Sequence, residues 1–88
     1  MLPEEVKKYC DSYQNGITLY DDLSEAFIGL SIRNKFYVAC YDFDKSVELI
    51  SKEKNISSEK AKRFLVDIIK TSYSGQETPI FVKKPKNG

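Results

Sequence analysis

The sequence predicts a small α+β domain: an antiparallel sheet of about three strands, packed by two consecutive helices, with another helix at the N-terminus. Two observations support this class. Apolar residues recur at three- and four-residue spacing in two successive segments, 43–54 and 58–73. Segments rich in β-branched and aromatic residues lie on either side of this pair, at 26–32, 36–41 and 79–83. Strands with a helical pair between them indicate a sheet with helices packed against it.

The first expected element is a helix over residues 3–14. Pro3 suits the first helical position, where its missing N–H costs no hydrogen bond. Gly16 can end the helix because glycine readily adopts the left-handed conformation. The apolar face of this helix consists of Leu2, Val6, Tyr9, Cys10 and Tyr13.

Two strands joined by a hairpin are expected next. Residues 17–20 suggest a short extended piece, and residues 21–25 a turn or a single helical turn. Apolar residues alternate over 26–32, which is typical of a strand. The turn Arg33-Asn34-Lys35 follows, and its asparagine can accept a positive φ. Residues 36–41 are almost entirely apolar or aromatic, which predicts a central strand buried on both faces.

Capping residues mark the ends of the two central helices. Asp42 can accept backbone N–H groups of the first turn, and Asn55 can end that helix in the left-handed conformation. Ser57 is placed to cap the second helix, which Gly75 should end. The apolar stripe of the second helix consists of Ala61, Phe64, Leu65, Ile68, Ile69 and Ser72, with Val66 outside it.

Pro79 indicates that the last strand lies at an edge of the sheet, because proline cannot donate a ladder hydrogen bond. The basic segment 83–88 is expected to be a frayed tail within the single domain 1–88. One face of the sheet should pack on the two central helices. We expect the other face to be covered either by the helix over 3–14 or by a second copy of the protein.

Composition excludes several classes of protein. The chain is 41% hydrophobic and 31% charged, which is typical of a soluble globular domain. No apolar run approaches the ~20 residues of a membrane span, and the acidic N-terminus does not resemble a secretory signal. The formal net charge of +1 combines a first half of −4 with a second half of +5. Such a division indicates a charged interaction face unless the fold mixes the two halves.

The sequence contains little that could perform catalysis. It has no histidine, and its two cysteines, Cys10 and Cys40, read as small buried hydrophobic residues. Asp42 and Asp44 form a D-x-D pair that can hold Mg²⁺ in some sites, but capping and the helix dipole also explain both carboxylates. We therefore expect no enzymatic activity, no cofactor and no bound metal.

Four short motifs occur in order between residues 22 and 82: 24–29 (SEAFIG), 40–45 (CYDFDK), 55–61 (NISSEKA) and 75–81 (GQETPIF). They resemble a family of small uncharacterised phage and bacterial proteins with the pattern DEAxxG, VYDYDK, helix, DGMSxEEA, helix ending in glycine, and TPxF. The chain departs from this pattern at Asp67-Ile68, where the family has an aromatic residue followed by asparagine. It departs again at Thr71, where the family has glycine. The resemblance implies architecture and origin, and with them the cytoplasm of a bacterial host cell.

The function that we expect is binding of a host protein or protein complex, as a stoichiometric inhibitor, for example of a bacterial immune system. This expectation rests on the setting of the similar family. The first alternative is a nucleic-acid or nucleotide-binding accessory module, and the second is a structural or oligomerising component. We expect no membrane partner, and a homodimer remains an alternative.

Charged residues outside capping positions, together with one polar residue of the hairpin turn, are the candidate binding residues. The preferred set lies around the hairpin turn and the preceding acidic segment: Asp21, Asp22, Arg33, Asn34 and Lys35. An alternative basic face lies on the second central helix: Lys60, Lys62, Arg63 and Lys70. The tyrosines could stack on bases of single-stranded nucleic acid, but core packing is the favoured interpretation.

Overall fold

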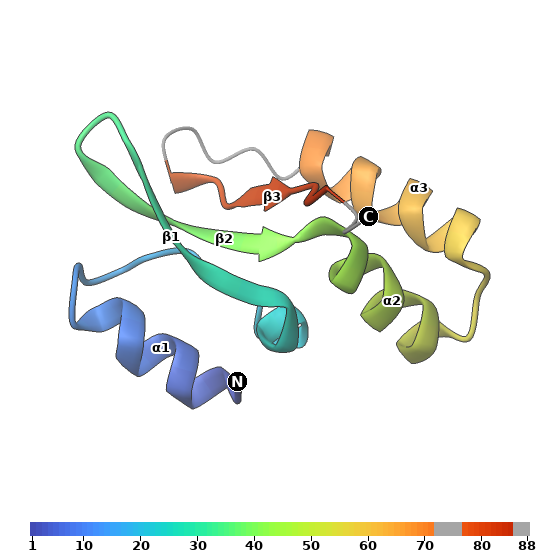
Figure 1. Cartoon of the computed structure of the whole chain (residues 1–88), viewed down its shortest axis with the longest axis horizontal. Coiled ribbons are helices and arrows are strands. Elements are labelled where there is room, and N and C mark those ends of the chain that lie inside the picture. Colours follow the sequence, from blue (N-terminus) through green and yellow to red (C-terminus); the bar gives the residue numbers. More distant parts are fainter. Residues whose placement is uncertain (72–76, 86–88) are drawn as a thin grey trace.

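The computed structural model describes residues 1–71 and 77–85 and confirms the α+β class (Figure 1). Its elements are α1 (Pro3–Asp11), the 3₁₀ helix η1 (Asp21–Ala26), β1 (Phe27–Arg33), β2 (Phe36–Asp42), α2 (Phe43–Lys54), α3 (Ser58–Thr71) and β3 (Ile80–Val82). The β1–β2 hairpin forms one end of the molecule, and α2 and α3 form the other (Figure 1).

The sheet has the order β1-β2-β3 and is mixed, not antiparallel as expected. β1 and β2 are antiparallel, with Leu30 opposite Ala39. β3 runs parallel to β2, with Phe81 beside Tyr41. A parallel neighbour requires a long crossover, and the segment that contains α2 and α3 is long enough to supply it. Side-chain alternation within a strand determines which residues share a face, and it carries no information about strand direction.

The hairpin turn and one bulge set the register of the first two strands. Asn34 has φ 49° and Lys35 has φ 74°, so both central turn residues are left-handed, as a type I′ turn requires. This confirms the prediction for Asn34. A register shift lies between Phe27 and Gly29, and Gly29 has φ 145°, which residues with a side chain rarely adopt.

The predicted helix boundaries around α2 are confirmed. The Asp42 Oδ1 accepts a hydrogen bond from the Lys45 N–H at 3.2 Å. Asn55 is left-handed, with φ 52° and ψ 51°. The Ser57 Oγ accepts a hydrogen bond from the Lys60 N–H at 3.2 Å, which caps α3. The predicted helix end at Gly75, the stripe residue Ser72 and the tail residues 86–88 lie outside the described residues.

The main core lies on the face of the sheet that carries Ala39 and Tyr41. Tyr41 is fully buried, and the rings of Tyr20, Phe27 and Phe81 lie with their centroids 5.6–5.9 Å from its own. Residues from three other elements complete this cluster: Leu23 and Ala26 of η1, Val47 and Ile50 of α2, and Ala61 and Leu65 of α3. Burial of these side chains is the main stabilising contribution to the fold.

α1 is shorter than expected and lies on the same face as the main core. It ends at Asp11, and not at residue 14. The Tyr9 ring contacts Phe27 and the Tyr13 ring contacts Tyr37. Phe27 is paired with Tyr41, so both side chains lie on the core face. Tyr37 precedes Tyr41 by an even number of residues in β2, so its side chain lies on the same face. Both contacts are therefore with the core face. Of the two alternatives for covering the second face of the sheet, the one that assigns it to this helix was therefore wrong.

Gln14, three residues beyond the end of α1, binds the edge of β2. The Tyr37 N–H donates to the Gln14 Oε1 at 3.1 Å, and the Gln14 Nε2 donates to the Tyr37 carbonyl at 3.4 Å. The side-chain amide thus replaces a neighbouring strand at this position of β2. Helix periodicity cannot reveal this long-range contact.

Candidate interaction groove

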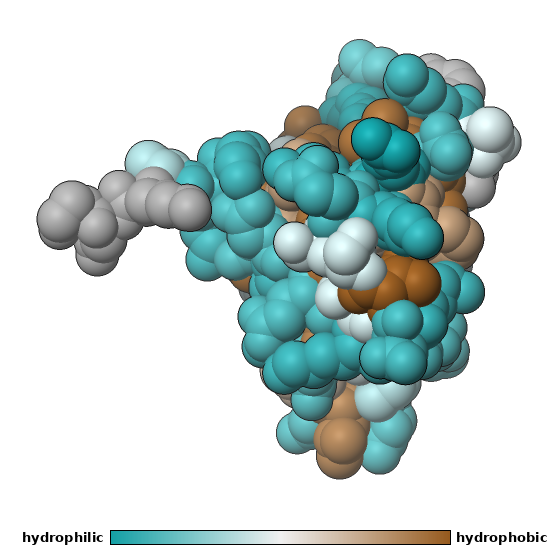
Figure 2. Space-filling view, turned by 90° about the vertical axis from the view of Figure 1, so that its right-hand side faces the viewer, coloured by the Kyte–Doolittle hydropathy of each residue, from teal (hydrophilic) through white to brown (hydrophobic). Residues whose placement is uncertain are grey.

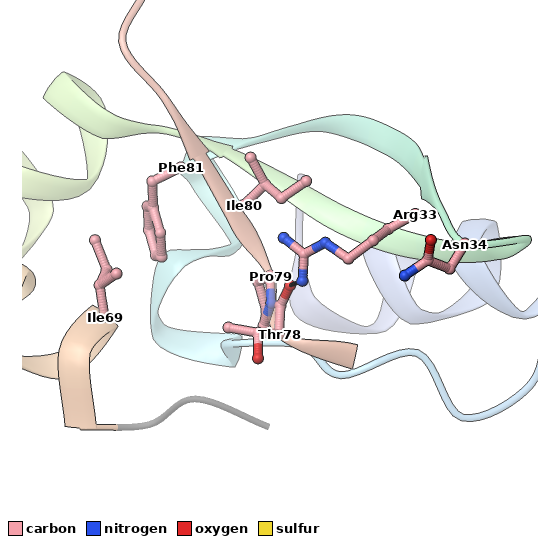
Figure 3. Close-up of a pocket in the computed structure, with 7 residues that line it drawn as sticks. All are labelled: Arg33, Asn34, Ile69, Thr78, Pro79, Ile80 and Phe81. Carbon is pink, nitrogen blue, oxygen red and sulfur yellow. Dashed lines mark hydrogen bonds between the residues drawn. The ribbon is translucent and has the colours of Figure 1, made fainter. Parts of the chain in front are cut away.

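An open groove of about 370 Å³ lies between the hairpin end, the start of β3 and the last turn of α3 (Figure 3). We call it the hairpin groove. Arg33 and Asn34 lie at one end of it, and Ile69 and Phe81 lie at the other (Figure 3). Its lining consists of Arg33, Asn34, Ile69, Thr78, Pro79, Ile80 and Phe81.

A long-range hydrogen bond joins Arg33 to Thr78 at the polar end of the hairpin groove. Arg33 is the last residue of β1, and its Nη1 donates to the Thr78 carbonyl at 3.1 Å. Arg33 is paired with Phe36, so its side chain leaves the sheet on the face that carries Val38 and Cys40. The guanidinium crosses this second face to the segment before β3 and fixes the hairpin end relative to that segment.

The other walls of the groove are apolar. Thr78 and Pro79 are buried, while Ile69, Ile80 and Phe81 are half-buried and present apolar surface. A guanidinium carries a permanent positive charge, so Arg33 gives this end of the groove a positive charge. The hairpin groove thus combines mainly apolar walls with a positive charge at one end.

The structure brings Arg33 and Asn34 into one groove and places the predicted acidic residues elsewhere. Asp21 and Asp22 lie in η1, at the start of β1, whereas the hairpin turn lies at its end. β1 is seven residues long, which separates the two groups by about 20 Å. Asp22 lines a second hollow of about 230 Å³ that also includes Phe64 and Ile68. The five preferred residues therefore flank one edge strand and do not form one compact site.

The alternative basic residues on α3 are all exposed. They are Lys60, Lys62, Arg63 and Lys70. At helical spacing, Arg63 and Lys70 share a stripe with the acidic residues Glu59 and Asp67, so the sign of charge changes along it. Figure 2 shows the α2–α3 end of the molecule as a largely hydrophilic surface with small hydrophobic areas.

The tyrosines that could have formed a stacking surface are mainly packed inside. Tyr41 is buried, and Tyr20 and Tyr37 are half-buried. Tyr73 lies outside the described residues. On α3, Leu65 and Ala61 are the buried residues of the apolar stripe, while 39% of Phe64 is exposed beneath the Lys54 ammonium group, 4.6 Å away.

The two aspartates of the D-x-D pair bind lysines that follow β3. The Lys84 Nζ lies 3.3 Å from the Asp42 Oδ2, and the Lys83 Nζ lies 2.6 Å from the Asp44 Oδ1. Burial alone would raise the pKa of Asp42, but the hydrogen bond from the Lys45 N–H and the charge of Lys84 lower it below its ordinary value. Within residues 1–71 and 77–85, no group of three possible metal ligands is present.

Both cysteines are buried thiols without a disulfide. Burial raises the pKa of Cys10, and the nearby Asp11 raises it further. Burial also raises the pKa of Cys40. A raised pKa leaves less of the nucleophilic thiolate at neutral pH.

The groove residues from the last strand were not singled out by sequence reasoning. Thr78, Pro79, Ile80 and Phe81 were interpreted only as an edge strand. Their signal was a proline followed by apolar residues at a sheet edge, which suits both packing and binding. Among the described helices, none combines the length and apolar character needed to cross a membrane.

The chain matches no protein-family model, and no curated protein or solved structure shows significant similarity to it.

Proposed function

We propose that the protein acts by binding a partner protein, without catalysing a reaction, and that the hairpin groove holds an extended segment of that partner. The observation that carries this proposal is the combination of apolar walls with a guanidinium anchored at one end. Small-molecule and peptide sites share this composition: mostly apolar lining with a few fixed polar groups.

The chemistry of the groove defines the segment that would fit. A large aliphatic or aromatic side chain would pack on Ile69, Ile80 and Phe81, which line the apolar part. Full burial of such a side chain contributes about 1.5–3 kcal/mol. An acidic residue beside it would lie in the positive potential of Arg33 and could contact the exposed Lys35 of the turn. Charges at the rim favour acidic partners mainly by accelerating association.

The resemblance to phage and bacterial proteins supplies the setting of this proposal. The partner would be a host protein in the bacterial cytoplasm, inhibited by stoichiometric binding, for example a component of an immune system. Binding to nucleic acid through Lys60, Lys62, Arg63 and Lys70 is the outcome against which the proposal is tested.

The experiment begins with selection of peptides from a random library on the intact protein. We expect the selected peptides to contain a bulky apolar residue next to an acidic one. Affinity is then measured by fluorescence anisotropy for three variants. Asn34→Asp adds a negative charge at the rim and keeps a residue that tolerates positive φ. Ile80→Ala removes part of the apolar wall, and Phe64→Ala is the matched control in the second hollow.

Asn34→Asp and Ile80→Ala should each weaken peptide binding about fivefold or more, while Phe64→Ala leaves it unchanged. Equal effects of all three substitutions would contradict the groove as the binding site. A labelled single-stranded oligonucleotide is tested in parallel. Binding that falls steeply with salt and disappears on neutralising Lys60, Lys62 and Arg63 would replace this proposal with nucleic-acid recognition.

A further inference from the structure

β1 forms an edge of the sheet that is long and weakly protected. In the sheet order β1-β2-β3, no described strand pairs with the outer edge of β1. Its seven residues, FIGLSIR, contain no proline and only one charged side chain, Arg33 at the last position. Natural proteins usually protect such edges with lysine, proline, bulges or a covering segment. In the part of the chain that the structure describes, the feature that protects this edge is the bulge at its beginning, between Phe27 and Gly29.

The hydrogen bonds of Gln14 reveal which backbone groups of β1 point outward. Gln14 binds both the N–H and the carbonyl of Tyr37, so these groups point away from β1. The pair formed by Ile32 and Tyr37 is therefore a non-hydrogen-bonded pair of the antiparallel ladder. Because such pairs alternate with hydrogen-bonded ones, the N–H and carbonyl groups of Leu30 and Ile32 point to the outer edge.

We propose that a second copy of this chain pairs with this edge. The two β1 strands run antiparallel about a two-fold axis at Leu30, and the two sheets join into one of six strands. At this axis, the outward N–H of each Leu30 donates to the outward carbonyl of the other Leu30, which is the geometry of a hydrogen-bonded pair. An interface of this kind is isologous and closed, so it yields a dimer and not a filament.

The exposed isoleucines of β1 are placed symmetrically about this axis. Ile28 is 43% exposed and Ile32 is 68% exposed, and each lies two residues from Leu30. Antiparallel pairing at Leu30 sets Ile28 opposite the partner's Ile32, and the reverse contact follows by symmetry. Ile28 also borders a hollow of about 240 Å³ that is lined by Met1, Tyr9, Phe27, Ile28 and Gly29. The partner's Ile32 would bury apolar surface against Ile28 and the edge of this hollow.

Charge at the two ends of β1 favours the same arrangement. The segment before β1 is acidic, with exposed Asp21, Asp22 and Glu25, and the segment at its end carries Arg33 and Lys35. Antiparallel pairing places the acidic end of one copy beside the basic end of the other, whereas parallel pairing would place like charges together.

A neighbouring register lacks these features. An axis at Ser31 would set Ile28 opposite the partner's Asn34 and Lys35 opposite the partner's Phe27. The contacts between isoleucines would be lost. Glu25, which precedes β1 and lies level with the partner's Lys35 when the axis is at Leu30, would be displaced from it by two residues. Of these two registers, the one with its axis at Leu30 matches both the apolar and the charged groups.

The first test measures mass by sedimentation and light scattering, from micromolar to millimolar concentrations of the full chain. We expect a dimer that dissociates on dilution. Ile32→Lys places an ammonium group at the edge, should weaken the dimer about tenfold or more, and should leave the thermal melt nearly unchanged because the side chain is exposed. Phe36→Lys is the matched control, since Phe36 is 47% exposed on β2, away from the edge. A monomer at every concentration, or equal effects of both substitutions, would overturn the proposal.

The second test examines the register by exchanging charges. Glu25→Lys and Lys35→Glu each create repulsion at both ends of the symmetric interface, and each should weaken the dimer a few-fold. The double variant restores both attractive pairs and should recover the dimer affinity of the original protein. Circular dichroism confirms folding of each variant. If the double variant fails to recover the dimer affinity, the interface is a different one and the proposal is overturned. The peptide measurements at the hairpin groove do not depend on this outcome.

Discussion

The phenolic oxygen of Tyr41 accepts a hydrogen bond from the backbone N–H of Tyr20 at 2.8 Å. This bond joins the central strand to the segment that leads into η1, from a side chain that is fully buried. Burial raises the pKa of Tyr41 to about 12. The Tyr41 hydroxyl thus helps to hold the segment at Tyr20 against the core face of the sheet. The buried surroundings of this hydroxyl favour its neutral form.

Replacing Tyr41 with phenylalanine should lower the free energy of unfolding by about 1–3 kcal/mol at pH 7, because the Tyr20 N–H loses its partner. The pH dependence provides a second check. The pKa of Tyr41 is higher in the folded protein than its unfolded value of 10.0. The neutral hydroxyl therefore contributes stability below pH 10.0, and this contribution is lost as the pH rises toward 12. Urea titrations between pH 8 and 12 should therefore show a smaller loss of stability in Tyr41→Phe than in the original protein. Parallel curves for the two proteins would contradict this role.

Replacing Gln14 with alanine should expose the edge of β2 at Tyr37. Both hydrogen bonds of the side-chain amide are lost, and we expect a cost of about 1–2 kcal/mol in the free energy of unfolding. Hydrogen exchange of the Tyr37 amide should accelerate more than that of other β2 amides. Asn15→Ala changes an exposed neighbour and serves as the control. Unchanged exchange at Tyr37 would exclude Gln14 as the group that protects this edge.

Replacing Lys35 with glycine should stabilise the hairpin by about 0.5–1 kcal/mol. Lys35 has φ 74°, a strained conformation for a residue with a side chain, and asparagine followed by glycine is a favoured type I′ pair. Lys35→Gln separates the effect of charge from that of the backbone and should be neutral.

At the end of α2, Asn55→Val should cost about 1–2 kcal/mol, because a β-branched residue is strained at φ 52°. Chemical denaturation of the variants measures each value, and a destabilised Lys35→Gly protein would contradict the turn assignment.

Replacing Asp42 with alanine should cost about 0.5–2 kcal/mol at pH 7 through loss of the helix cap. The pKa of Asp42 is lowered in the folded protein, so the stability that its charge contributes is present above the unfolded value of 3.8. It is lost as pH falls through the folded value. Thermal melts should therefore show the two proteins converging below pH 3.8. Asp44→Ala, whose ion pair with Lys83 is exposed, should change stability by less than about 0.5 kcal/mol. A difference between the Asp42 proteins that stays constant down to pH 2 would show that the carboxylate charge plays no part.

Local signals in the sequence predicted the middle of the fold well. The expected range 43–54 for the first central helix agrees with α2 at both ends. The reason is that a cap at Asp42 and a left-handed residue at Asn55 act within one turn of the helix. Burial within the second central helix was predicted less accurately, because the apolar stripe predicted that Phe64 and Ile68 would be buried together with Leu65. The structure buries Leu65 and leaves the other two at the second hollow.

The candidate site was predicted only in part. Arg33 and Asn34 were identified from the turn, and both line the hairpin groove. Ile69 and Phe81, which form its other end, are far from them in the sequence. Their approach to Arg33 depends on β3 lying beside β2, and no local pattern predicts this pairing. Whether these residues bind a partner stays a prediction.

The sequence by itself determined the α+β class, the approximate positions of the helices and strands, and the left-handed residues Asn34 and Asn55. These features depend on interactions between residues a few positions apart, which the order of side chains specifies directly. Only the tertiary structure decided the parallel direction of β3, the contact of Gln14 with the edge of β2, and the grouping of Arg33 with Thr78. Each of these depends on contacts between distant segments, where many pairings satisfy the same local pattern. The free energy of burial in one shared core selects among them.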